Sequence, residues 1–375
     1  MNFKFFLFIF CLVFSLTLKG QNNAASKLKF NADFRFRAEQ DWNSQKPDGS
    51  FRDNRSRLRY RVRAGFNYNY NSWASFGARI RTGNPIKQQD PQLTLGDEFN
   101  ILPIGFEKIY FNAEQDNYKF WIGKNTFPFE KLNELFWSDN VYPEGVFIKK
   151  KSKNTSSFFS KLNISAGHFI LKTNGTSFNK DSYFQGIQIS TLTHNKSIKL
   201  FTSFYNFKNI PNIPDGNETF TFNYAIVNIG SQIKLSKKTN LTLETDYYAN
   251  LKDYSNNNFI EDKFKNEKNG IVTALSIGHL KQKKDWKLKA TFSYMERYAA
   301  VDFLAQNDWA RWDYSNYNSP DGRLTNFKGI ELVANYLLEK NIKLTLKYYK
   351  VKQILPFGVS NETGDRLRLD LDIKI

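Results

Sequence analysis

The chain has 375 residues, of which 41% are apolar, 24% charged and 17% aromatic, and its formal net charge is +18. So many aromatic residues argue against a disordered chain, and a single cysteine excludes an internal disulfide or a thiolate metal cluster. Three histidines leave little material for a histidine-based metal or catalytic site.

The first twenty residues have the pattern of a secretory signal peptide. Lys4 supplies a positive charge, residues 5–18 are almost unbroken apolar sequence, and Gly20 offers a small residue for cleavage. The apolar run is about fourteen residues long, short of the ~18–20 that a spanning helix needs. We predict a cleaved signal over residues 1–20, Sec-type export, and one domain over residues 21–375.

From residue 27 onward, apolar and polar residues alternate with a period of two. Between Leu28 and Ala38 the even positions are all apolar, while the odd positions between Lys27 and Glu39 are polar or charged. Side chains of a strand point to opposite faces in turn, so each such run has one apolar and one polar face. A helix would distribute both sets around its axis.

About sixteen runs of this kind extend to the end of the chain, with edges uncertain by a few residues. Their predicted spans are 27–42, 55–71, 73–83, 104–114, 117–125, 144–151, 157–169, 182–194, 197–208, 222–236, 239–250, 270–280, 285–298, 326–338, 341–352 and 366–375. Short turns such as 71–72 alternate with long polar connections such as 251–269, which is typical of a transmembrane barrel. We predict an all-β fold, a transmembrane antiparallel barrel of about sixteen strands. A soluble β-sandwich is the competing interpretation.

A barrel whose apolar faces contact lipid must place its charged faces inside, and such an interior has to contain water. Ten of the fifteen arginines lie between Arg35 and Arg81. On three successive predicted strands they share one face and should form a basic wall of the pore. This predicted basic wall comprises Arg35, Arg37, Arg55, Arg57, Arg59, Arg61, Arg63, Arg79 and Arg81. The predicted lumen acids are Asp33, Glu39, Glu244 and Asp246.

Three interpretations of the basic wall stay open at this point. It could attract anions, it could pair with lumen carboxylates and only brace the barrel, or it could face an acidic patch and set up a transverse field that shapes the pore. The connection 84–103 carries Asp90, Asp97 and Glu98. It is a candidate constriction loop if it folds inward, and an exposed loop otherwise.

Several stretches resemble the Bacteroidota-type "putative porin" family of outer-membrane barrels. They are the alternating arginines 57–61 followed by Gly65, RIRTG at 79–83, GKNTFPF at 123–129, LFWSDNVYPEG at 135–145 and DLDIKI at 370–375. The resemblance implies an outer-membrane diffusion channel without a defined substrate. The chain ends in Ile375, where many such barrels have an aromatic residue. In the most distinctive stretch, two interpretations stay open: a turn that shapes a loop, or a functional role as a constriction or a partner contact. The residues concerned are Trp137, Asp139, Asn140, Pro143 and Glu144.

We therefore expect a passive outer-membrane porin of a Gram-negative cell, for small hydrophilic solutes. The alternative is a solute-specific anion channel, for phosphate or an acidic sugar. No catalytic, Walker or Rossmann pattern is present, so we expect neither an enzyme nor a cofactor. Expected partners are outer-membrane lipid, the barrel-assembly machinery and a second copy of the chain, and export excludes nucleic acid. A purely structural or adhesive barrel would show no conductance.

Overall fold

A computed structural model of the chain describes residues 27–84, 89–96, 101–153, 158–175, 177–211, 220–310 and 325–375. The signal peptide predicted over residues 1–20 lies outside this part. The described ranges contain seventeen strands: β1 (Leu28–Trp42), β2 (Arg55–Asn69), β3 (Ala74–Thr82), β4 (Leu93–Thr94), β5 (Ile104–Gln115), β6 (Tyr118–Lys124), β7 (Glu144–Lys153), β8 (Phe159–Lys172), β9 (Ser182–Thr193), β10 (Ile198–Pro211), β11 (Thr221–Ser236), β12 (Leu241–Asn250), β13 (Asn269–Gly278), β14 (Trp286–Met295), β15 (Phe327–Glu339), β16 (Ile342–Gln353) and β17 (Thr363–Lys374). Short 3-10 helices, η2 (Phe178–Lys180), η3 (Asp262–Phe264) and η4 (Asp302–Leu304), lie in connections of the same ranges.

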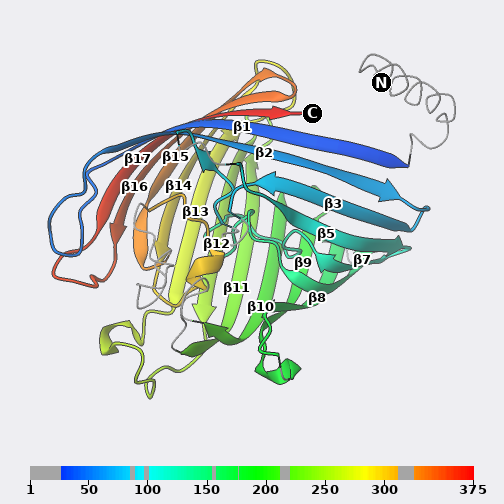
Figure 1. Cartoon of the computed structure of the whole chain (residues 1–375). Helices are drawn as coiled ribbons and strands as arrows, with labels where there is room; N and C mark the ends of the chain where they lie inside the picture. The colour runs from blue at the N-terminus through cyan, green and yellow to red at the C-terminus, as the bar shows by residue number, and fades with distance from the viewer. Residues whose placement is uncertain are drawn as a thin grey trace, which may run out of the picture.

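Sixteen of the strands close into one antiparallel barrel (Figure 1). Each pairs with its neighbours along the chain, and β1 pairs with β17 from Asp33 opposite Lys374 to Trp42 opposite Asp365, which closes the ring. The predicted all-β barrel is confirmed, and its sixteen predicted runs correspond one to one with these strands. Only the two-residue β4, which pairs with β2 beside Arg59 and Tyr60, was not predicted.

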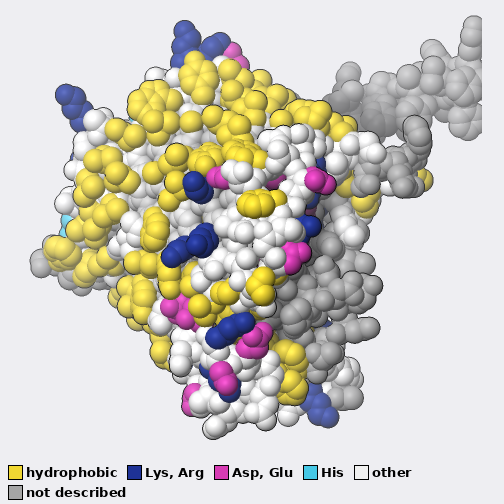
Figure 2. All heavy atoms as spheres, turned by 90° about the vertical axis from the view of Figure 1, so that its left-hand side faces the viewer, with side chains coloured by type: hydrophobic (Ala, Val, Ile, Leu, Met, Phe, Trp, Pro, Cys, Tyr) yellow, Lys and Arg dark blue, Asp and Glu magenta, His cyan; other side chains and the backbone are white. Residues whose placement is uncertain are grey.

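The two faces of the strands meet different surroundings. On β17, Leu369 is 42% exposed and points outward, whereas the neighbouring Asp370 is 1% exposed and points into the barrel. This is the reverse of a soluble protein, and it matches an outer face in contact with lipid. Figure 2 shows hydrophobic side chains gathered over the upper and left-hand parts of one side of the molecule, with charged side chains in the centre and lower part and some at the upper edge. Among the described residues, no helix combines the length and hydropathy needed to cross a membrane.

The connections alternate in length, so one end of the barrel has short turns and the other has long loops. Turns such as 70–73, 116–117 and 340–341 lie at the short end, and both ends of the described chain are there too. Ile375 donates its backbone N–H to the carbonyl of Ala32 at 2.9 Å, so the last strand is tied beside the first.

The barrel contains a core of its own. Lumen-facing aromatic side chains of β6 to β12 pack against the connection between β6 and β7, which lies within the ring of strands (Figure 1). The charged side chains gather on the other side of the lumen, on β16, β17, β1 and β2. The water-accessible space is therefore placed between an aromatic half and a charged half.

Candidate functional site

The connection 125–143, here called the inner loop, narrows the lumen. Trp137 is fully buried, and its ring stacks on that of Phe127 with centroids 4.6 Å apart. Phe136 stacks in the same way on Tyr248 of β12, at 5.1 Å and an interplanar angle of 8°. These rings bury large apolar surfaces in well-packed geometry, so the inner loop is fixed to the wall rather than hanging free.

Glycines in the wall permit this close packing. At Gly186 of β9, a Cβ atom would lie 2.5 Å from the ring of Phe129, so any larger residue would push the inner loop away from the strand. Gly123 at the end of β6 has a φ of +114°, a conformation that L-residues rarely adopt, and there the chain turns into the inner loop.

Polar wall side chains complete the attachment of the inner loop. Asp246 of β12 accepts the backbone N–H of Leu132 at 3.0 Å and the side-chain amide of Asn133 at 2.7 Å. Gln188 of β9 accepts the N–H of Glu130 at 2.8 Å and donates to its carbonyl at 2.9 Å. Asp246, a predicted lumen acid, is thus covered by the inner loop and does not line open space.

Two further connections meet the inner loop inside the barrel. Ser138 donates its N–H to the carbonyl of Leu304 at 2.7 Å, and Gln306 donates to the carbonyl of Glu134 at 3.0 Å. Gln89 donates its side-chain amide to the carbonyl of Ala305 at 3.1 Å. The described parts of connections 83–103 and 296–326 therefore join the inner loop in one constricted region.

Opposite the aromatic half, four rows of lumen-facing residues cross β16, β17, β1 and β2 in register. We call these sixteen positions the four-rung wall. The rungs are Lys343, Asp372, Arg35 and Arg61; Thr345, Asp370, Arg37 and Arg59; Lys347, Arg368, Glu39 and Arg57; and Tyr349, Arg366, Asp41 and Arg55. Ten of the sixteen side chains are cationic and four are carboxylates, so the wall has a clear excess of positive charge.

Ion pairs join neighbouring strands within the rungs. Arg35 Nε lies 2.6 Å from Asp372, and Arg37 forms two hydrogen bonds with Asp370, of 2.6 and 2.8 Å. Glu39 forms ion pairs with both Arg57 and Arg368. Its carboxylate therefore bridges the two guanidinium groups. Because two arginines face each other directly in two of the rungs, part of the positive charge must be balanced from outside the wall.

Some of that balance comes from the loops. Arg59 donates to Asp90 Oδ2 at 2.6 Å and to the carbonyl of Gln92 at 3.0 Å. Asp90 is thereby brought against the predicted basic wall, whereas Asp97 and Glu98 lie outside the described residues. Arg61 pairs with Asp33 of β1.

Two other arginines of the predicted basic wall, Arg63 of β2 and Arg79 of β3, hold the inner loop. Arg63 and Arg79 share Glu107 of β5, each at 2.6 Å. Arg63 also donates to Asn140 Oδ1 at 2.9 Å, and Arg79 donates to the hydroxyl of Tyr142 at 2.7 Å. The stretch 139–142, open between a turn and a constriction in the sequence, is therefore bound directly to two of these arginines.

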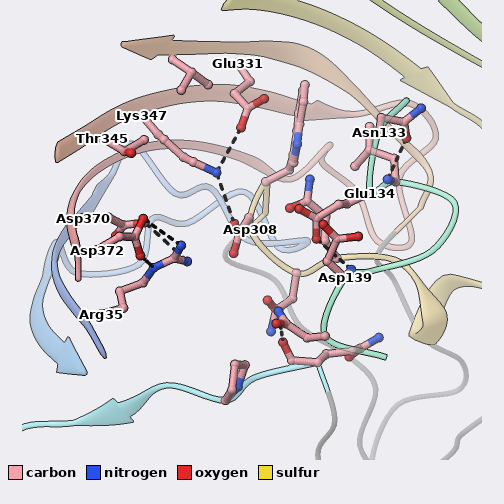
Figure 3. Close-up of a pocket in the computed structure, with 18 of the residues that line it drawn as sticks. Arg35, Asn133, Glu134, Asp139, Asp308, Glu331, Thr345, Lys347, Asp370 and Asp372 are labelled. Atoms are coloured by element: carbon pink, nitrogen blue, oxygen red, sulfur yellow. Dashed lines mark hydrogen bonds and ion pairs between the residues drawn. The ribbon is translucent and has the colours of Figure 1, made fainter. Parts of the chain in front are cut away.

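A cavity of about 830 Å³ lies between the four-rung wall and the inner loop. Figure 3 shows Arg35, Asp370 and Asp372 on one side of it, with Glu134 and Asp139 of the inner loop on the other. Its described lining includes ten basic and ten acidic side chains. Arg35, Arg37, Arg61, Arg63 and Arg79 line the cavity, as do Asp33, Asp90 and Glu244; Arg55, Arg57, Arg59, Arg81, Glu39 and Asp246 do not.

Two loop carboxyl groups at the cavity differ in their ionisation. Burial, reinforced by the nearby Asp139 carboxylate, raises the pKa of Glu134. Burial also opposes ionisation of Asp308, but the charges of Arg368, Arg37 and Lys347 outweigh it and hold the pKa of Asp308 well below its usual range. The surrounding cations therefore favour the ionised form of Asp308.

Within the described residues, no group of three or more His, Cys, Asp and Glu side chains could hold a metal ion. His168 points outward, where its Nδ1 lies 3.3 Å from the amide nitrogen of Gln185, and His279 lies 2.7 Å from Asp285 near a turn. Neither histidine belongs to the lumen.

The sequence did not single out the inner loop as a whole, or Asp308, as parts of the site. One sequence feature does indicate the inner loop: a long connection in which the period of two is lost contains four aromatic residues, Phe127, Phe129, Phe136 and Trp137. Such a cluster of rings outside a strand has to be buried somewhere. Nothing in the sequence around Asp308 distinguishes it from other acidic loop residues.

Comparisons with known proteins agree with this architecture. Residues 18–223 and 219–374 match the family described as "Putative porin". Among solved structures, OprB of Pseudomonas putida superposes with a TM-score of 0.58 at 12% identity, covering 94% of this chain and 95% of that one. A triple mutant of the Rhodopseudomonas blastica porin superposes with a TM-score of 0.52 at 12% identity, covering 92% and 100%. No curated protein matches the sequence.

A closed sixteen-stranded barrel with a lipid-facing apolar surface, a charged lumen and an inward-folded loop defines a channel protein of the porin class, not an enzyme. The family match covers nearly the whole chain, so the chain belongs to the "Putative porin" family of outer-membrane channels.

Proposed function

We propose that this porin is a passive diffusion channel for small hydrophilic solutes. The observation that carries the proposal is the cavity of about 830 Å³, which is bounded by the four-rung wall and by the acidic side of the inner loop. The lining has equal numbers of basic and acidic side chains, with an excess of basic ones on the four-rung wall and an excess of acidic ones, Glu130, Glu134 and Asp139, on the inner loop. This distribution gives a transverse field with little net charge. Such a field favours polar solutes by orienting them, and it does not select solutes by the sign of their charge.

A second candidate function is a channel specific for anions such as phosphate or an acidic sugar. The observation that favours it is the excess of cations in the four-rung wall, which contains ten basic side chains and four carboxylates. Rings and rows of arginine or lysine are the usual means by which a pore prefers anions.

Conductance in planar bilayers separates these functions. A passive general channel should give ohmic single-channel steps, a reversal potential close to zero in a KCl gradient, and no block by phosphate. Liposome swelling should show uptake of neutral sugars that slows with their size. A strongly anionic reversal potential with phosphate block would favour the anion channel, and an absence of any conductance would contradict both.

The proposal includes the cellular setting. We infer that residues 1–20 direct Sec-type export, that residues 21–375 form a single barrel domain in the outer membrane of a Gram-negative cell of the Bacteroidota type, and that the barrel-assembly machinery inserts it. The lipid-exposed apolar surface described above supports a membrane setting. Crosslinking of the purified protein in detergent would show whether it associates with a second copy.

A further inference from the structure

The segment 305–310, between β14 and β15, lies deep in the lumen and is held there by β17. Arg366 donates to the carbonyls of Asn307, Asp308 and Ala310 at 3.4, 2.6 and 3.3 Å. The side chain of Trp309 is buried against Phe327 and Tyr349, with both ring centroids 5.7 Å away. The backbone and the tryptophan together place Asp308 against the four-rung wall.

The carboxylate of Asp308 faces three cations from three strands. It forms an ion pair with Arg368 of β17, lies 3.8 Å from Arg37 Nη1 of β1, and lies 3.9 Å from Lys347 Nζ of β16. Figure 3 shows Lys347 between Asp308 and Glu331. The two longer distances exceed those of direct hydrogen bonds, so Arg37 and Lys347 act on the carboxylate through their charge, whereas Arg368 contacts it directly.

These three cations do not need Asp308 to keep their positions. Arg37 has its two hydrogen bonds with Asp370, Arg368 pairs with Glu39, and Lys347 Nζ lies 3.8 Å from Glu331. The guanidinium groups of Arg37 and Arg368 are almost fully buried, with side chains only 4% and 3% exposed. The site is thus preorganised by the wall, and the loop supplies an additional anion.

We propose that Arg37, Lys347 and Arg368 form a binding site for the carboxylate group of a small solute, which Asp308 fills when no such solute is present. This inference rests on the proposed channel function and deepens it by naming a substrate class. A carboxylate that the protein itself places among three cations defines the ligand chemistry that the site accepts. A solute carboxylate would compete with Asp308 for the same positive charges, so occupancy by the loop weakens solute binding.

The test uses succinate as the probe, on the full-length protein and on two variants that each remove one lumen carboxylate. Asp308→Asn keeps the size of the side chain and removes the competing charge. Asp139→Asn is the matched control, because Asp139 also lines the cavity but pairs with Lys131 of the inner loop at 2.6 Å, on the opposite side. Heat-modifiable migration in gels verifies that each barrel is folded.

Equilibrium dialysis of the detergent-solubilised proteins measures binding without any need for conductance. We expect Asp308→Asn to bind succinate about tenfold more tightly than the unaltered protein, since one like charge is removed from the site, and Asp139→Asn to bind it no better. Adding Lys347→Gln to Asp308→Asn should abolish most of the gain. Equal gains in both single variants, or no gain in Asp308→Asn, would overturn the proposed site.

Single-channel recordings distinguish failure of the site from failure of the channel. With a functioning channel, succinate should block chloride current in Asp308→Asn at about tenfold lower concentration than in the unaltered protein. If all variants are silent in bilayers while Asp308→Asn still binds succinate more tightly, the channel function is wrong and the carboxylate site stands. If conductance is normal but Asp308→Asn binds succinate no more tightly than the unaltered protein, the channel function stands and the carboxylate site is wrong.

Discussion

Arg59 and Arg61 occupy successive lumen-facing positions on β2, and each has a carboxylate partner, Asp90 and Asp33 respectively. Both directly face another arginine across the ladder, Arg37 and Arg35. Paired arginines can still attract anions, because the pairing leaves the summed charge of the wall positive.

Replacing both residues, Arg59→Glu and Arg61→Glu, should shift the ion preference of the pore toward cations. The change reverses two charges beside the cavity, and we expect the anion-to-cation permeability ratio to fall by about tenfold. Reversal potentials in a KCl gradient measure this ratio. The double variant should still migrate in gels as a folded barrel that resists unfolding until it is heated. An unchanged anion-to-cation permeability ratio in such a folded barrel would show that these arginines do not determine selectivity.

Glu267, in the connection between β12 and β13, carries a separate pH dependence. Burial and the nearby Glu296 raise its pKa to about 7, and one of its oxygens is buried without a hydrogen-bond partner among the described residues. Because the folded form holds the proton more tightly than an unfolded chain would, protonation stabilises this connection. That contribution is complete below pH ~4.5 and is lost as the pH rises through 7.

We therefore expect the connection 251–268 to be cleaved faster by an added protease at pH 8 than at pH 6. Glu267→Gln stays uncharged, so its cleavage rate should be nearly the same at the two values. Glu261→Gln, an exposed change in the same connection, is the control and should behave like the unaltered protein. Identical pH dependence in all three proteins would contradict the role of Glu267.

Among the elements, the inner loop is held against the wall by aromatic packing. Phe136 contacts Tyr205, Phe207 and Tyr248, all of them on the lumen face of the wall. Phe136→Ala should cost the loop attachment about 3 kcal/mol. The barrel ladder, which does not involve this side chain, should form as before.

The expected result for Phe136→Ala is a larger and noisier single-channel conductance, together with faster proteolysis within 125–143. Lys131→Ala is the control, since Lys131 belongs to the same loop but lies at the cavity rather than in the aromatic core. Gly186→Val should act in the same direction as Phe136→Ala, because its new side chain would displace Phe129. A quiet, unchanged pore in both variants would show that the inner loop does not limit conductance.

In the whole molecule, the outer face of the barrel is apolar and its inner face is polar and charged. Leu369 lies outward near the middle of β17, so Leu369→Arg would place a charge in hydrocarbon and should destabilise the inserted barrel by about 2–4 kcal/mol. Asn335→Arg adds the same side chain beside the cavity and should cost far less. Folding into lipid vesicles, titrated with urea, measures both; equal costs would contradict the assignment of the two faces.

The strands and their two faces follow from the alternation of residue types along the chain. Alternation as regular as that of β17 and β2 is a local property, since a strand directs successive side chains to opposite sides whatever surrounds it. Sixteen such runs, joined by short and long connections in turn, were enough to predict the barrel.

The division of the lumen, by contrast, depends on how the chain folds. Which connections fold inward depends on contacts between residues far apart in the chain, such as Phe136 with Tyr248 and Asp308 with Arg37. The alternation of polar and apolar residues along the chain does not predict these contacts. The register of β16, β17, β1 and β2, which gathers ten cations in four rungs, likewise exists only once the first and last strands meet and the ring is closed.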